Sequence, residues 1–221
     1  MPTTVAQNIK GLLYGGFVSL PLVLISVVSF LALTLGNLGL TMLALGHIVI
    51  VPLLVFFVNL LVEFVAPGNP MISVTSSDVS SLIPSLTSAG QTMYVAPSYW
   101  IAHITFFFTF LFTNALVLNL KDPTPSADPN KVENRKAQTM TAMIISLVLF
   151  LALVAFRVVM TGTETWLGTL IGASLVIPVS YGWYELARVC GARDADIFGI
   201  LQKILPEGAK DEPPMTCVYN P

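Results

Sequence analysis

Charge is scarce in this chain of 221 residues, in which 10% of the residues are Asp, Glu, Lys or Arg and 55% are hydrophobic. A soluble domain of this length usually carries about a quarter charged residues. So few charges cannot cover the surface of a water-soluble globule. The composition therefore excludes the soluble classes and predicts an integral membrane protein.

Recognisable catalytic motifs are absent as well. The chain has no GxxxxGK[ST] phosphate loop, no GxSxG nucleophile elbow and no HExxH zinc site. No lysine lies within an apolar run, which excludes a retinal Schiff base. We therefore expect no enzymatic activity, no cofactor and no metal site.

What the sequence does contain is a series of long apolar runs, at residues 12–35, 38–65, 97–120, 138–160 and 166–190. Each run is long enough for one helix across a hydrocarbon core of about 30 Å. The runs are continuously apolar and do not alternate, which favours helices over the strands of a barrel. We predict an all-α fold, a polytopic membrane helix bundle with about five transmembrane helices. Residues 1–190 form the bundle, and residues 191–221 form a polar tail with one short amphipathic helix in DIFGILQKIL.

Basic residues are distributed unevenly around these runs. The side with the loop 121–137 and the C-terminal tail carries eight Lys and Arg residues, whereas the side with the N-terminus and the loop 66–96 carries two. Basic loops face the cytosol, so we expect an external N-terminus and a cytosolic C-terminus. Cys190 and Cys217 then both lie on the cytosolic side, where a structural disulfide is not expected.

Ionisable residues within or beside the spans are the candidates for function. His47 lies inside the second span, where an ionisable group is a functional candidate by default. The alternative is a neutral imidazole that bonds to a hydroxyl or carbonyl of a neighbouring helix. Arg157 and Glu164 flank the turn before the last span. They are placed either for a salt bridge across that turn or for Arg157 to reach lipid phosphates.

Two further patterns indicate how the spans sit. Aromatic residues at span ends are typical of belts at the membrane interfaces, and they are Tyr99, Trp100, Trp166, Tyr181, Trp183 and Tyr184. Glycines four positions apart place small residues on one helix face, which permits close helix packing. These pairs are Gly11 with Gly15 and Gly168 with Gly172.

The stretch APSYWIAHITFFF at residues 96–108 resembles a motif of the phosphatidic acid phosphatase type-two family. That family has Pro-Ser-Gly-His at a helix start, whereas here Pro97-Ser98 is followed by Tyr99 and His103 is displaced by three positions. Downstream, Arg157 matches the arginine of the family, but Glu164 stands where the nucleophilic histidine should be. Phosphoryl transfer through a phosphohistidine requires that imidazole. The resemblance therefore implies a lipid phosphatase relative without its catalytic residues.

A second resemblance covers most of the chain. The segments NIKGLLYGGF, KVENRKAQ, TGTETWLG, SYGWYELARVCGARDADIFGI and PMTCVY, together with residues 93–115, are similar to a multi-span membrane protein of algal and amoebal large DNA viruses. This resemblance implies a location in the lipid membrane beneath an icosahedral capsid. It does not imply a reaction. In this interpretation Pro97 lies in the first turn of a helix, Ser98 supplies a cap hydroxyl, and Tyr99 and Trp100 mark the membrane interface.

Three functions remain open at this point. The first is a structural membrane protein that contacts the lipid bilayer and assembles with itself or with other membrane or capsid proteins through its C-terminal tail, with no nucleic-acid partner. The second is a channel or transporter, which His47 within a span favours. The third is the inactive relative of the lipid phosphatases.

Overall fold

The structure, a computed structural model, describes residues 15–69, 71–75, 92–94, 96–123, 129–161 and 164–192. Its helices are α2 (Leu20–Leu35), α3 (Leu38–Leu45), the π-helix η1 (Gly46–Ile50), α4 (Val51–Val65), α5 (Tyr99–Leu120), α6 (Pro129–Thr161) and α7 (Trp166–Val189). Two short strands, β1 (Ser73–Thr75) and β2 (Thr92–Tyr94), pair antiparallel. The predicted amphipathic helix of the tail and most of the predicted loop 66–96 lie outside the described residues.

The predicted all-α helical bundle is confirmed. Four helical segments are long and apolar enough to cross a membrane, and they are Leu38–Val65, Tyr99–Leu120, Pro129–Val159 and Trp166–Val189. The fifth, α2, is a shorter apolar helix of 16 residues. Residues 15–18 before it are also helical, while residues 12–14 of the predicted first span are outside the described ranges.

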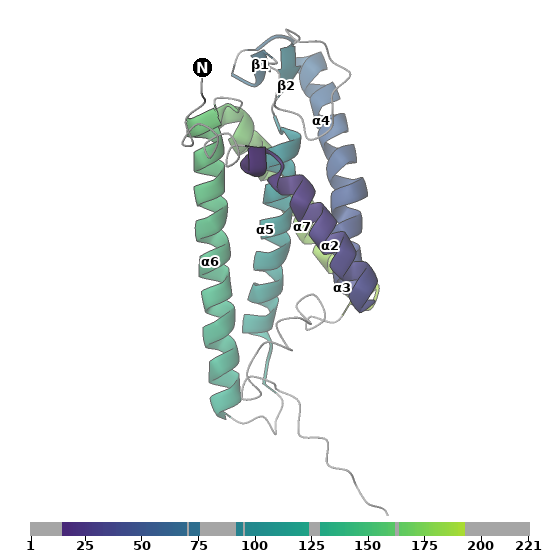
Figure 1. The fold of residues 1–221 in the computed structure, drawn as a ribbon, viewed down its shortest axis with the longest axis vertical. Helices are drawn as coiled ribbons and strands as arrows, with labels where there is room; N and C mark the ends of the chain where they lie inside the picture. Colours follow the sequence, from purple (N-terminus) through teal and green to yellow (C-terminus); the bar gives the residue numbers. More distant parts are fainter. Residues whose placement is uncertain are drawn as a thin grey trace, which may run out of the picture.

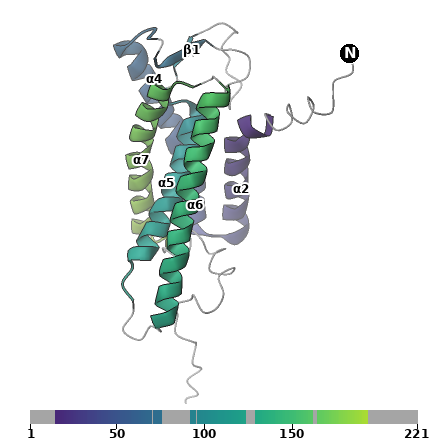
Figure 2. The ribbon, with the colours of Figure 1, turned by 90° about the vertical axis from the view of Figure 1, so that its left-hand side faces the viewer.

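The helices run in alternating directions, so that the bundle has two distinct ends (Figures 1 and 2). We call one the sheet end, where the β1–β2 pair lies with the starts of α5 and α7. We call the other the basic end, which carries the Gly36 turn, Lys121 and Arg188. Helix α5 is central and packs most extensively against α6 and α7. Residues 15 and 192, the outermost described positions, lie at opposite ends, as an odd number of helical passes requires.

The turn between the first two passes is made by Gly36 and Asn37, the two residues that separate the apolar runs 12–35 and 38–65. Gly36 ends α2 with a φ of 59°, in the left-handed region that glycine adopts without strain. Asn37 then caps α3, because its side-chain oxygen accepts a hydrogen bond from the Leu40 backbone at 3.0 Å. The turn is tight, and α2 packs directly against α3.

Proline shapes the interior of the second pass. Pro52 has no backbone N–H, and in a regular α-helix its ring would clash with the carbonyl of Ile48. The chain responds with the wider π-turn of η1, in which the Val51 N–H donates to the Gly46 carbonyl. The π-turn carries His47, and such turns are frequent at functional sites.

A second proline, Pro21, leaves a backbone carbonyl free to accept a hydrogen bond from another helix. Because Pro21 has no N–H, the carbonyl of Phe17, four residues earlier, lacks its usual helical donor. The indole Nε1 of Trp100 donates to this oxygen at 3.2 Å. The start of α5 is thereby tied to the segment that leads into α2.

Helix α6 differs from the prediction at its start. Residues 121–137 were predicted to form a solvated loop, with the span beginning at residue 138, but the helix begins at Pro129. Proline suits the first position of a helix, and no proline follows it as far as Thr161. The charged residues between them are good helix formers. With 33 residues, α6 is about 50 Å long, which exceeds the hydrocarbon core of about 30 Å.

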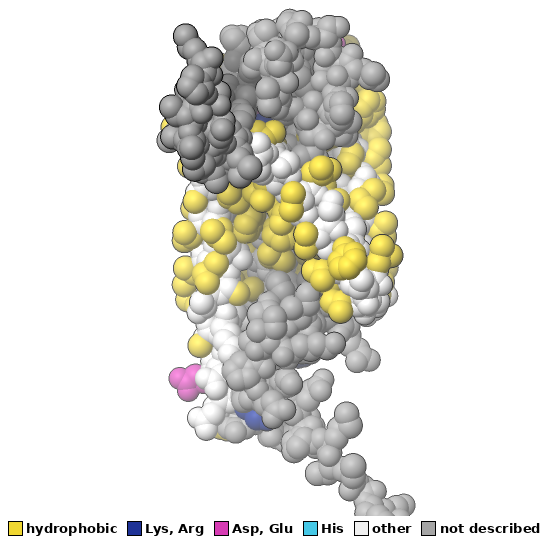
Figure 3. Space-filling view, viewed as in Figure 1, with side chains coloured by type: hydrophobic (Ala, Val, Ile, Leu, Met, Phe, Trp, Pro, Cys, Tyr) yellow, Lys and Arg dark blue, Asp and Glu magenta, His cyan; other side chains and the backbone are white. Residues whose placement is uncertain are grey.

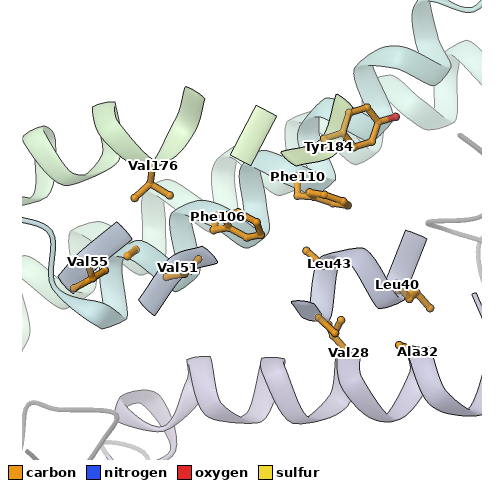
Figure 4. Packing of buried hydrophobic residues seen from close by; sticks show 12 residues of the cluster. Val28, Ala32, Leu40, Leu43, Val51, Val55, Phe106, Phe110, Val176 and Tyr184 are labelled. Carbon is orange, nitrogen blue, oxygen red and sulfur yellow. The ribbon is translucent and has the colours of Figure 1, made fainter. Parts of the chain in front are cut away.

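The core lies where α2, α3, α4 and α7 meet the central helix, as Figure 4 shows for Val28, Leu43, Phe106, Phe110 and Tyr184. The outer faces are apolar, and Leu33 and Phe64 are each 85% exposed. In Figure 3 apolar side chains cover the middle height of the visible face. Lipid tails are as apolar as these side chains, so helix association depends on close packing and on interhelical hydrogen bonds.

Candidate functional site

Two polar clusters lie inside the bundle and contain the candidate residues. The first, which we call the end cluster, is made of Ser98, Trp100, Arg157 and Glu164 at the sheet end. The second is the histidine pair, His47 and His103. Each cluster joins different helices.

Ser98 begins the end cluster because it caps α5. Its hydroxyl oxygen accepts a hydrogen bond from the Ile101 N–H at 3.2 Å, as the sequence predicts for a cap. The same hydroxyl donates to Glu164 Oε1 at 2.6 Å. The prediction for Pro97 is wrong, since this residue precedes the cap and is not in the first turn, and its peptide bond with Ala96 is cis.

Arg157 forms a salt bridge with Glu164, at 3.4 Å between Nε and Oε1, which is the first of the two alternatives that the sequence left open. Both side chains are 1% exposed, so Arg157 does not reach toward lipid phosphates. Its guanidinium carbon lies 5.2 Å from the centroid of the Trp100 ring, within the range of a cation–π interaction. The cluster thus connects the end of α6, the start of α5 and the turn before α7.

Two opposing effects act on the Glu164 carboxyl group. Burial raises its pKa above the ordinary value, because the ionised form loses its hydration. The hydrogen bond from Ser98 and the charge of Arg157 lower it, but they do not cancel the effect of burial. Among the described residues Glu164 Oε2 has no hydrogen-bond partner. A buried carboxylate with one free oxygen is costly, which is consistent with the raised pKa.

The glycines predicted to mediate packing do not share one environment. Gly172 faces Pro97 so closely that a Cβ atom added to it would lie 2.5 Å from the proline Cβ. Gly168 is also buried, within the first turn of α7. Gly15 is exposed, with open space where its Cβ would be. Gly11 lies outside the described residues.

The prediction of aromatic belts holds for only part of the set. Trp166 and Tyr181 are exposed, at 63% and 52%. Trp100 and Tyr184 are buried, at 2% and 0%, so for these two the prediction is wrong. Trp183 is also turned inward, since its indole Nε1 donates to the Met42 carbonyl at 2.7 Å. These rings are held by partners in neighbouring helices rather than by lipid headgroups.

The histidine pair joins the π-turn to the central helix. His47 Nδ1 and His103 Nδ1 are 3.1 Å apart, and both side chains are almost completely buried. In the structural alternative His47 was predicted to bond to a hydroxyl or a carbonyl, but its partner is the other imidazole. The two histidines are 56 positions apart, so the sequence alone did not predict this contact. The available signal was only that each histidine lies in an apolar span.

The residues that carry the phosphatase resemblance fall into two separate clusters. Ser98 and Arg157 both contact Glu164, whereas His103 bonds to His47. Within the described ranges, no three His, Cys, Asp or Glu side chains are grouped as they would be around a metal ion. Comparison with protein-family models, curated proteins and solved structures finds no match for this chain.

Proposed function

We propose that this chain is a structural integral membrane protein, a rigid bundle that assembles with itself or with other proteins in or beside its membrane. The observation that carries the proposal is that polar bonds join α5 to α6 at both ends, and join both of them to the start of α7 at the sheet end. At the sheet end, the end cluster joins all three helices. At the basic end, Asn119 donates to Thr139 at 2.9 Å, and Arg135 donates to the Lys121 carbonyl at 2.6 Å.

These bonds support a fixed shape rather than a moving one. In a membrane an interhelical hydrogen bond contributes only about 0.6 kcal/mol on average, so a single bond would not fix the position of two helices. Several ties at opposite ends of the same helices restrict both sliding and splaying. The location beneath a viral capsid stays a prediction, because it depends on the sequence resemblance alone.

The basic end is proposed to face the cytosol. Five basic residues of the described chain belong to this end, and they are Lys121, Lys131, Arg135, Lys136 and Arg188. At the sheet end Arg157 is the described basic residue, and its charge is paired with Glu164. The asymmetry favours retention of the basic end on the cytosolic side.

Fluorescence transfer in lipid vesicles tests the structural proposal. Two populations of the protein, labelled with donor and acceptor dyes, are mixed and diluted with increasing amounts of lipid. A self-assembling protein keeps its transfer efficiency as lipid is added. Transfer that falls to the level of random mixing contradicts self-assembly.

The second candidate is a channel or transporter, which the buried histidine pair favours. The same vesicles, loaded with a pH-sensitive or ion-sensitive dye, distinguish the two functions. The structural proposal expects no flux above that of empty vesicles. A flux that disappears in His47→Asn would support the transport function instead.

A further inference from the structure

The two imidazoles of the histidine pair meet head-on. The ring centroids are 5.4 Å apart and the Nδ1 atoms 3.1 Å apart, and the difference corresponds to the radii of two five-membered rings. Both Nδ1 atoms therefore lie close to the line between the rings, whose planes differ by only 27°. This is the geometry of an Nδ1–H···Nδ1 hydrogen bond, in which one ring donates and the other accepts.

The surroundings of His47 indicate which ring donates. His47 Nε2 is buried without a partner among the described residues. If His47 accepted at Nδ1, its proton would sit on Nε2 and would be a buried, unsatisfied donor. If His47 donates at Nδ1, Nε2 is a bare lone pair, which is less costly to leave unpaired. In the neutral pair, His47 therefore donates to His103, and His103 carries its own proton on Nε2.

We infer that the histidine pair is a proton-binding site inside the bundle, which takes up one proton at His47 Nε2 and can release one from His103 Nε2. The neutral pair holds two protons on four ring nitrogens. A third proton on His47 Nε2 leaves the Nδ1–H···Nδ1 bond intact. The bridging proton can then shift to His103, which becomes the imidazolium. Loss of the Nε2 proton of His103 restores a neutral pair with its donor and acceptor exchanged.

Few charged groups face this site. The π-turn packs against α3, α4 and α5, and its Gly46 also lies close to Trp183 of α7. The ionisable residues of α7 are Tyr181, Tyr184, Glu185 and Arg188. Helix α3 contains no ionisable side chain, and Glu63 of α4 is 16 positions from His47. Helix α5 contributes Tyr99 and His103 itself. The added charge is shared by two rings, and the Phe106 ring, 5.1 Å from that of His47, can attract it through a cation–π interaction.

A proton fits the observed separation better than a metal ion does. Two metal–imidazole bonds of about 2 Å each, in line, require nitrogens about 4 Å apart. The observed 3.1 Å is the length of an N–H···N bond. The Gly46 backbone packs closely on the Phe106 ring, where an added Cβ would lie 2.4 Å from that ring, so separation of η1 from α5 to admit a metal ion would lose this contact.

Magic-angle-spinning ¹⁵N NMR tests the inference on the full-length protein in phosphatidylcholine bilayers. The chain has only two histidines, so with a histidine-free purification tag every imidazole signal comes from the pair. Between about pH 8 and about pH 4, which brackets the ordinary imidazole range, the spectra should change from two protons per pair to three. The nitrogen–nitrogen coupling between the two Nδ1 atoms should persist in both states.

The variant His47→Asn is the matched control, because its side-chain amide can replace the Nδ1 bond but cannot take up a proton. It should lose the coupling and the three-proton state. Four results would each overturn the inference: no coupling at any pH, no protonation across the range, full protonation of both rings in a single step, or an unchanged three-proton state in His47→Asn. A spectrum that changes after treatment with bathocuproine or EDTA would also overturn it, in favour of a metal site. The test does not depend on the proposed structural function, since it measures protons rather than assembly.

Discussion

Gly172 of α7 and Pro97, just before the cap of α5, are in such close contact that no side chain fits at position 172. A Cβ on Gly172 would lie 2.5 Å from the Cβ and 2.9 Å from the Cα of Pro97. The Cα belongs to the backbone and the Cβ to the proline ring, so neither atom can rotate away. This contact sets the distance between the two helices next to the end cluster.

Gly172→Ala should therefore destabilise the bundle by about 1–3 kcal/mol, the usual range for overpacking. Unfolding by sodium dodecyl sulfate in mixed micelles measures the change. Gly182→Ala, in the same helix, is the control, because nothing lies within 4 Å of its added Cβ. It should be neutral or slightly stabilising, since alanine is the better helix former. Equal effects of the two substitutions would show that the contact with Pro97 does not matter.

Trp100→Phe should cost about 1–2 kcal/mol, because it leaves the Phe17 carbonyl without its indole donor. In a Pro21→Ala background the cost should be smaller, since the introduced alanine would supply the missing helical N–H to that same carbonyl. A double-mutant cycle of unfolding free energies measures this coupling. Strictly additive effects would argue that Trp100 acts only through its ring against Arg157.

The raised pKa of Glu164 gives a pH dependence of defined sign. A carboxyl group whose pKa is higher in the folded state binds protons more tightly there, so its contribution is fully present below the ordinary value of 4.5. That contribution is lost as the pH rises from 4.5 through the folded-state pKa. The unfolding free energy of the wild type should therefore fall with rising pH in this window. Glu164→Gln should flatten the slope, and an unchanged slope would assign the dependence to another group.

Cysteine labelling tests the orientation of the bundle. In a background with Cys190→Ser and Cys217→Ser, Met71→Cys reports on the sheet end and Asp122→Cys on the basic end, since both positions are exposed. A membrane-impermeant maleimide should reach them from opposite sides, with position 122 on the cytosolic side. Labelling of both from the same side would contradict the alternating passes.

The spans were predictable because hydropathy is a local property. Predicted and observed bounds agree within two residues for Leu38–Val65, Tyr99–Leu120 and Trp166–Val189. The cap at Ser98 and the turn at Gly36 also follow from local rules, since each depends on a side chain or a φ angle at one position. Long apolar runs and strong local signals are therefore sufficient for the outline of this fold.

The polar clusters were not predictable in the same way, because their partners are distant in sequence. His47 and His103 are 56 positions apart, and Ser98 and Glu164 are 66 apart. The belt prediction failed at Trp100 and Tyr184 for the same reason. An aromatic residue at a span end faces the interface by default, but contacts with another helix override this preference. The Arg157–Glu164 salt bridge was predictable, since the two residues are seven positions apart across one turn.

The early start of α6 has a consequence at the membrane surface. Its first nine residues, 129–137, precede the predicted span and are charged or polar for the most part. At a rise of about 1.5 Å per residue they extend the helix by about 14 Å beyond the predicted span. Two hydrogen bonds hold this extension against the end of α5: Arg135 donates to the Lys121 carbonyl, and Asn119 donates to the Lys136 carbonyl. The polar start of α6 therefore extends beyond the hydrocarbon core, so that its charged side chains lie among the lipid headgroups and in the adjacent water.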